Sequence, residues 1–193
     1  MLVAFPTRRE RYGYVASLSL TLARLALAVP LALTSSGRLA AALLAAGLIS
    51  DVYDGVVARR FGVATTGLRR LDSAVDSIFY LAAAWCVWRL HPDVARSHRW
   101  LIAAVIATLL VNHAFEIWKF GREASYHAWL AKAWGAVLVS ALMLLFLAGD
   151  VRWLTVALWM GIASHVENFL ITLALVECRT DVKSLIHVVR SAG

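Results

Sequence analysis

The sequence predicts an all-α integral membrane protein, with six transmembrane helices that follow a short interfacial segment. Of the 193 residues, 61% are hydrophobic and 16% are charged, and the mean hydropathy is +0.73. A soluble domain would carry about 25% charged residues, and its core could not hide this much apolar surface. The apolar residues also gather in runs of roughly twenty, which is the length that crosses a bilayer.

Six apolar runs of spanning length follow one another along the chain. They cover residues 17–35, 38–59, 72–90, 98–119, 129–148 and 152–176. Turn-forming residues separate these runs, and they occupy positions 35–37, 62–67, 91–93, 121 and 149–150. We therefore expect one domain over residues 1–193, in which residues 17–176 form a six-helix core.

The two ends of the chain are expected to lie outside the hydrocarbon. Residues 1–16 contain arginines but no small-residue cleavage pattern, so we interpret them as a retained segment at the interface. From Cys178 onward apolar and polar residues alternate. We expect residues 177–193 to be a cytoplasmic tail that contains a short surface helix.

The distribution of lysine and arginine predicts the orientation. With a cytoplasmic N-terminus, twelve of these residues fall on the cytoplasmic side and five on the opposite side, which favours both termini in the cytoplasm. The net charge of +7 is spread over the ends of the apolar runs, as expected for contact with lipid rather than nucleic acid. Arg24 and Lys132 fall inside spans. A bacterial inner membrane is the expected location.

Four aspartates stand at the cytoplasmic ends of the second and third runs. Asp51 and Asp54 are three residues apart and Asp72 and Asp76 are four apart, so each pair shares one helix face. If the chain turns back between the runs, all four carboxylates can meet, and their repulsion would call for cations. Oxygen ligands select hard ions, so we expect Mg²⁺ or Mn²⁺, with two ions in the site.

Small residues beside the first pair suggest a phosphate-bearing ligand. Gly55 and Ala58 leave the helix surface bare, so that a ligand can approach the backbone. Arg59 offers planar donors to phosphate oxygens. Two metal ions beside a pyrophosphate would neutralise it and stabilise a leaving phosphate.

These positions together resemble the signature of the CDP-alcohol phosphotransferase family (CDP-alcohol phosphatidyltransferases). The signature reads D-x-x-D-G-x-x-A-R, then a glycine, then D-x-x-x-D. The positions that match are Asp51, Asp54, Gly55, Ala58, Arg59, Asp72 and Asp76. Upstream, Leu20-Thr21, Arg24 and Pro30 resemble the family's L-T-x-x-R followed by proline, although the usual preceding Pro-Asn is Ser17-Leu18 here.

The resemblance implies six transmembrane helices, a homodimer and a site that faces the cytoplasm. It implies that all four aspartates hold metal and that Asp76 is the general base for the acceptor hydroxyl. The cytidine diphosphate is expected along residues Thr21, Asp54, Gly55, Ala58, Arg59 and Gly67.

Two departures from the family pattern concern the substrates. The second glycine usually stands four residues before the third aspartate, where this chain has Leu68, and the nearest glycine is Gly67. Family members that use glycerol phosphate often carry a G-K-x-K-T-like stretch on the fifth helix, of which Lys132 is the lysine that remains. This weakens a specific assignment as phosphatidylglycerophosphate synthase.

Three basic residues are candidates for binding an acceptor or phosphate. Arg69 and Arg70 lie close to Asp72, and they serve either as positive-inside anchors or as phosphate ligands. Lys132 either pairs with a carboxylate or binds an acceptor phosphate. For His113, Glu116, His165 and Glu167 we expect packing or interhelical hydrogen bonds.

The resulting hypothesis is an enzyme of phospholipid biosynthesis. It would transfer a phosphatidyl group from a CDP-linked lipid such as CDP-diacylglycerol to a small hydroxyl acceptor and release CMP. Phosphatidylglycerophosphate synthase is one alternative. A degenerate nucleotide-binding membrane protein or a divalent-cation carrier is the other, although a carrier would need polar residues across the whole bilayer.

Overall fold

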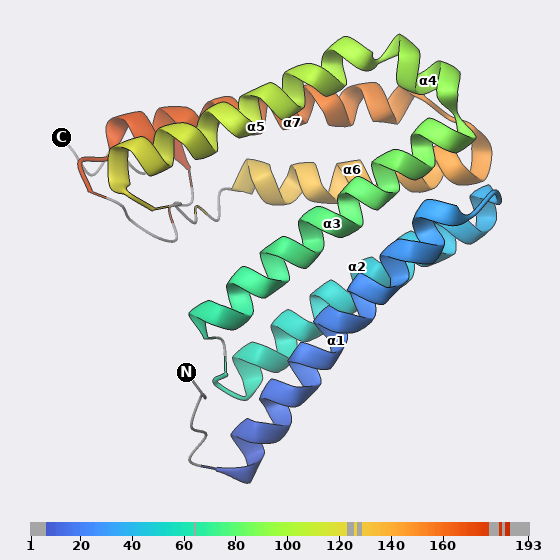
Figure 1. Ribbon diagram of the computed structural model, residues 1–193. Helices are drawn as coiled ribbons and strands as arrows, with labels where there is room; N and C mark the ends of the chain where they lie inside the picture. Colours follow the sequence, from blue (N-terminus) through green and yellow to red (C-terminus); the bar gives the residue numbers. More distant parts are fainter. Residues whose placement is uncertain are drawn as a thin grey trace. The chain divides into compact units, whose positions relative to one another are not determined.

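The computed structural model describes residues 7–63, 65–122, 126, 129–177, 182 and 184–185, without the side chains of residues 66, 69 and 70. These residues form seven helices and no strand, and Figure 1 shows the helices with their labels. The chain is divided into two compact units, one over residues 1–92 and the other over residues 93–193. The all-α prediction is confirmed.

The first unit contains three long helices, α1 (Arg8–Leu33), α2 (Gly37–Arg60) and α3 (Thr66–Leu90). Helix α1 packs along both α2 and α3, while α2 and α3 have a smaller contact with each other (Figure 1). A stripe of residues three and four apart forms the buried face of α1: Gly13, Ser17, Thr21, Arg24, Ala28 and Leu31. This spacing keeps all six on one side of the helix, so α1 presents a small and polar face to its two neighbours.

Helix α1 begins earlier than expected. Thr7 caps it in a capping box with Glu10, a signal that starts helices. Residues 8–16, which we assigned to a separate interfacial segment, are therefore continuous with the first span. Residues 1–6 lie outside the described part of the chain.

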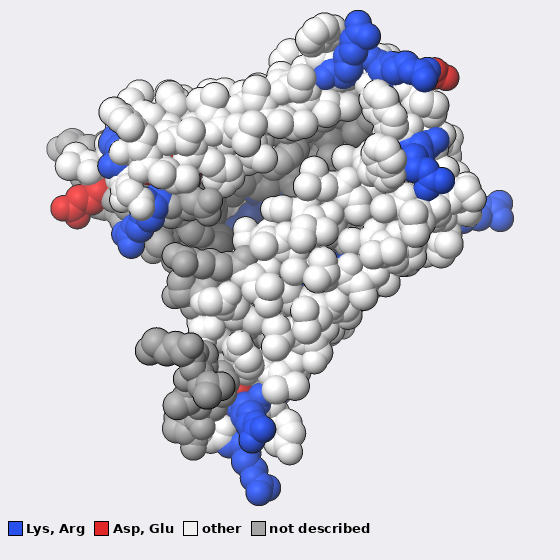
Figure 2. Space-filling model, in the orientation of Figure 1, with Lys and Arg blue, Asp and Glu red and all other residues white. Residues whose placement is uncertain are grey.

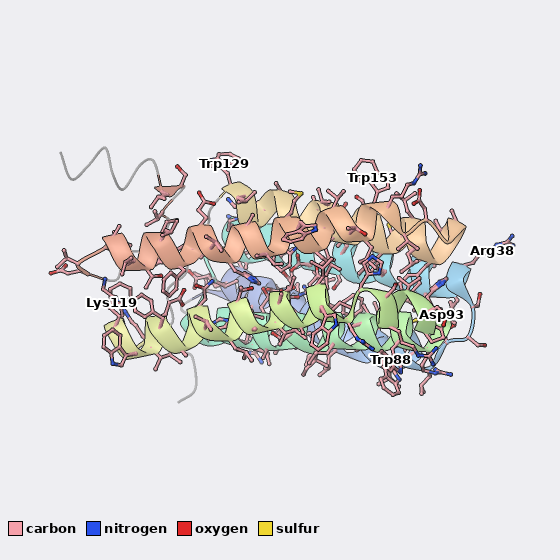
Figure 3. The ribbon with its side chains drawn as sticks, turned by 90° about the horizontal axis from the view of Figure 1, so that it is seen from above. Arg38, Trp88, Asp93, Lys119, Trp129 and Trp153 are labelled. Atoms are coloured by element: carbon pink, nitrogen blue, oxygen red, sulfur yellow. The ribbon has the colours of Figure 1, made fainter. Side chains whose placement is uncertain are left out.

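The second unit contains α4 (Pro92–Ser97), which begins at the boundary, then α5 (Arg99–Phe120), α6 (Trp129–Ala148) and α7 (Arg152–Ala174). Helix α7 packs against both α5 and α6. The short α4 begins at Pro92, within the break predicted at residues 91–93. Proline suits the first position of a helix, so this residue starts a helix there. In Figure 3, Lys119 and Asp93 lie toward opposite ends of this unit, and Trp129 and Trp153 point outward. The expected surface helix of the tail falls mainly outside the described residues.

Polar side chains connect α5 and α7 across the second unit. Nδ1 of His165 lies 2.9 Å from Oγ1 of Thr108, and the Asn112 side chain donates to the His165 carbonyl at 2.8 Å. Nζ of Lys119 donates to the carbonyls of Thr172 and Leu173 at the end of α7. The expected interhelical hydrogen bonding is therefore confirmed for His165.

Among the residues that the structure describes, five helices are long and apolar enough to cross a membrane: α1, α2, α5, α6 and α7. Helix α3 has 25 residues, which is sufficient length, but the charges of Arg69, Arg70, Asp72, Asp76 and Arg89 lower its hydropathy. The predicted third span, 72–90, thus stays a prediction. Figure 2 shows Lys and Arg gathered mainly at the ends of the helices, with broad uncharged surfaces between them. The protein is an integral membrane protein by this composition.

Close packing of α2 on α3 at Gly47 generates a prediction about stability. A Cβ atom at position 47 would lie 2.2 Å from Cζ of the buried Phe79 ring. We expect Gly47→Ala to lower the free energy of unfolding by about 1–3 kcal/mol, because the core would be overpacked. Thermal unfolding of the purified protein in detergent measures this change.

Gly135→Ala is the matched control, since a Cβ there would meet no atom within 4 Å. Alanine is the better helix former by about 1 kcal/mol, so the control is expected to keep or raise stability. Equal losses in both variants would contradict this account of the packing.

Candidate active site

A short turn brings the two pairs of aspartates together. Helix α2 ends at Arg60, and Gly62 has a φ of 68°, a left-handed conformation that glycine adopts without strain. The Val63 amide donates to the Ala58 carbonyl at 2.9 Å, and the Thr65 side chain caps α3 by accepting from the Leu68 amide at 3.2 Å. The chain therefore reverses within a few residues, and the last turns of α2 face the first turns of α3.

All four aspartates surround the guanidinium of Arg24, which reaches them from α1. Nη1 lies 3.1 Å from Oδ1 of Asp51 and 3.1 Å from Oδ1 of Asp72, and it also contacts Oδ1 of Asp76. Nη2 contacts Oδ2 of Asp54. The Arg24 side chain is 1% exposed. Its charge thus offsets part of the repulsion among the carboxylates in an apolar bundle.

Asp54 is the most enclosed of the four, with a side chain that is 4% exposed. The Thr21 hydroxyl shares its one hydrogen between Oδ2 of Asp54, at 3.3 Å, and the Ser17 carbonyl, at 3.2 Å. The Ser17 hydroxyl donates to the Asp54 carbonyl at 3.4 Å. Another hydroxyl, that of Ser50, donates to the Leu20 carbonyl at 2.7 Å and adds a further link between α1 and α2. Helix α1 therefore fixes the position of Asp54 through both its side chain and its backbone.

The other three aspartates form a group that fits a metal ion. One carboxylate oxygen from each of Asp51, Asp72 and Asp76 lies within 4.8 Å of the other two. Their side chains are 43%, 33% and 33% exposed, so a solute can reach them. A donor set made only of carboxylate oxygens suits Mg²⁺ or Mn²⁺. Asp54, predicted as a fourth ligand, stands beside this group and is held by α1.

The glycine and arginine of the first pair lie against each other. A Cβ atom at Gly55 would lie 3.2 Å from Nη1 of Arg59, so the Arg59 side chain folds back over the bare surface at Gly55. Ala58 is buried, and it packs in a cluster with Val63 and Leu68. The small residues of this helix face therefore make room for the arginine and for the start of α3.

The two residues at the shifted glycine have different surroundings. Leu68 is 5% exposed and packs on Ala58, so a leucine fills the place where the family pattern has glycine. Gly67 is exposed, and a Cβ there would meet nothing within 4 Å. The predicted role of Gly67 in nucleotide binding stays a prediction.

The predicted acceptor residues are not brought to the aspartates by any described contact. Arg69 and Arg70 belong to the first turn of α3, but their side chains lie outside the described part of the structure. Lys132 is an exposed residue of the second unit, and its Nζ lies 5.5 Å from the ring centroid of Trp129.

Sequence reasoning did not assign Arg24 or Ser17 to the site. The available signal for Arg24 was its charge inside an apolar run, because such a charge is costly without partners. Ser17, Thr21 and Arg24 follow one another at intervals of four and three residues, so they lie on the same face of α1. A polar stripe on an otherwise apolar helix thus marked the side of α1 that meets the carboxylates.

Comparison with known proteins gives one match. The model of the family described as CDP-alcohol phosphatidyltransferase matches residues 15–175. This range includes Thr21, Arg24 and all four aspartates. No curated protein and no solved structure matches the chain.

The hydrogen bond from Thr21 to Asp54 can be tested by a nearly isosteric change. Thr21→Val removes the hydroxyl while keeping the shape of the side chain, and it leaves a buried carboxylate with one donor fewer. We expect the free energy of unfolding to fall by about 1–3 kcal/mol, measured by thermal unfolding in detergent. Thr21→Ser retains the hydroxyl and is expected to lose less stability. A loss in Thr21→Ser larger than the loss in Thr21→Val would show that the methyl group contributes more than the hydrogen bond, and it would contradict this account.

Proposed function

The chain belongs to the CDP-alcohol phosphatidyltransferase family, and from this premise we propose that it transfers a phosphatidyl group from CDP-diacylglycerol to a small hydroxyl acceptor and releases CMP. The family transfers phosphoalcohol groups from CDP-alcohols in phospholipid biosynthesis, and it uses divalent metals. The observation that carries the proposal is the convergence of Asp51, Asp54, Asp72 and Asp76 around one point.

The reaction is a single displacement at phosphorus. The acceptor hydroxyl gives its proton to the carboxylate of Asp76 and attacks the β-phosphorus of the donor. A bond forms between the acceptor oxygen and this phosphorus, while the bond from it to the oxygen shared with the α-phosphorus breaks, so CMP leaves with that oxygen. Oδ1 of Asp76 faces the centre that the aspartates share, where Arg24 contacts it, and the second carboxylate oxygen is the one that we assign to the proton.

The metal site is assigned to the aspartates. Asp51, Asp72 and Asp76 would hold Mg²⁺ or Mn²⁺, and Asp54 would complete a site for two ions. When bound, the ions would neutralise the pyrophosphate and stabilise the phosphate of the departing CMP.

The nucleotide is assigned to the face of α2 that bears the signature. Arg59 is exposed beside Gly55, so its guanidinium is available to phosphate oxygens. Asp54, Thr21, Ala58 and Gly67 are the remaining residues that we assign to the cytidine diphosphate.

A lipid donor suits the surface that flanks the aspartates. Exposed apolar side chains stand next to them, Val52, Tyr53 and Val56 on α2 and Ile78 on α3. These side chains could contact acyl chains while the headgroup reaches the carboxylates.

Several finer assignments stay predictions from the sequence. Arg69, Arg70 and Lys132 remain the candidates for an acceptor phosphate. The homodimer, the cytoplasmic orientation of the site and the bacterial inner membrane also remain predictions.

The test is CMP release by purified protein with CDP-diacylglycerol, Mg²⁺ and a panel of acceptor alcohols. We expect release with one acceptor, loss on chelation, and a loss of about a hundredfold or more in Asp51→Asn and Asp72→Asn, because a ligand is removed. Asp93→Asn is the matched control, since Asp93 is exposed and pairs with Arg96, and it should retain activity. Near-normal turnover in the two site variants would refute the mechanism, and no release with any acceptor would refute the reaction.

A further inference from the structure

One nitrogen of Arg24 occupies the place where a metal ion would be expected. Nη1 contacts Oδ1 of Asp51, Asp72 and Asp76, and these three residues form the group whose oxygens fit a cation. An arginine nitrogen and a metal ion cannot share such a position, because both need close approach to the same oxygens.

The arginine satisfies the three carboxylates incompletely. Nη1 has two hydrogens, and it donates them to Asp72 and Asp76, so its contact with Asp51 is electrostatic without a hydrogen bond. In the described structure Nε of this buried side chain has no hydrogen-bond partner, and such an orphan donor is unfavourable. A divalent ion carries twice the charge and can accept more oxygen ligands.

The contact of Arg24 with Asp54 differs from its contacts with the other three aspartates. Nη2 of Arg24 contacts Asp54, which Thr21 also holds and which stands outside the three-aspartate group. This contact is made through Oδ2 of Asp54, so it can persist when Nη1 leaves the other three carboxylates and the other oxygen of Asp54 completes the site for two ions. Asp54 is therefore the partner about which the guanidinium can pivot.

We propose that Arg24 is the internal counter-cation of the metal-free site and competes with the divalent cation for Asp51, Asp72 and Asp76. In the metal-free protein its charge holds α2 and α3 to α1, and metal binding moves Nη1 off the three carboxylates. This inference rests on the metal requirement of the proposed function and adds a positioning role for a residue of α1.

The proposed role of Arg24 predicts opposite effects of its removal on the stability of the metal-free protein and on the affinity for a divalent cation. Removing the charge leaves four carboxylates to repel one another, so the metal-free protein loses stability. It also removes the competitor, so the affinity for a divalent cation rises. A residue that only supported the fold would weaken both the fold and the metal site.

The experiment titrates Mn²⁺ into purified, nucleotide-free protein and follows free Mn²⁺ by electron paramagnetic resonance. We expect Arg24→Gln to bind Mn²⁺ at least about tenfold more tightly than the wild type, given the strength of charge interactions at this range. Without metal its melting temperature should be lower than that of the wild type, and Mn²⁺ should raise it by more. Arg24→Lys keeps a charge but not the fork that reaches both Asp54 and the other three, and it should bind Mn²⁺ with intermediate affinity.

Arg89→Gln is the matched control, because Arg89 also links α3 to α1, through the Ala32 carbonyl at 2.9 Å. It should leave the affinity for Mn²⁺ unchanged. Unchanged or weaker Mn²⁺ binding by Arg24→Gln would overturn the proposal. If Arg24→Gln cannot be purified, an affinity of Arg24→Lys no tighter than that of the wild type would overturn it equally.

CMP release and Mn²⁺ binding by the wild type distinguish a failure of the role of Arg24 from a failure of the proposed function. Chelator-sensitive CMP release by the wild type, with no change of Mn²⁺ affinity in the variants, would overturn the role of Arg24 alone. Absence of Mn²⁺ binding in every protein would overturn the role of Arg24 and the metal requirement together. Tighter binding by Arg24→Gln without CMP release by any protein would support the role of Arg24 and count against the reaction.

Discussion

The need to balance the charge of four carboxylates inside an apolar bundle constrains the whole first unit. A charged side chain within a membrane costs at least about 2.5–3.5 kcal/mol, and here four aspartates from two helices stand close together. Arg24 offsets part of this charge from a third helix. For its guanidinium to reach both α2 and α3, helix α1 must lie against both, and its small residues Gly13 and Ser17 permit this approach.

Hydropathy predicted the helices well, because each apolar run of spanning length has to satisfy its backbone hydrogen bonds internally. Hydropathy was less informative about where helices begin and about helices that carry charged side chains. Pro92 starts a helix at a place that read as a break, and the capping box at Thr7 joins the interfacial segment to the first span. The carboxylates of Asp72 and Asp76 form part of the site, and the same charges lower the hydropathy of α3. Composition alone therefore does not settle whether α3 crosses the membrane.

The spacing of the aspartates predicted the site, since residues three and four apart share a helix face whatever their surroundings. Spacing within one helix does not show which other helix lies opposite, so the central place of Arg24 required the structure. The role of Leu68 was hidden for a similar reason, because its packing on Ala58 depends on the turn between α2 and α3. Lys132 shows the limit in the other direction, since a lysine in an apolar run can lie at an exposed position over an aromatic ring.

The order of residues along the chain has a consequence for biogenesis. Arg24 is synthesised before all of its partners, and Asp76 follows it by 52 residues. When α1 first leaves the ribosome, its arginine has no acid to meet, and a lone arginine is disfavoured in lipid. The charge of Arg24 is therefore offset only after α2 and α3, which carry its four aspartate partners, have been synthesised.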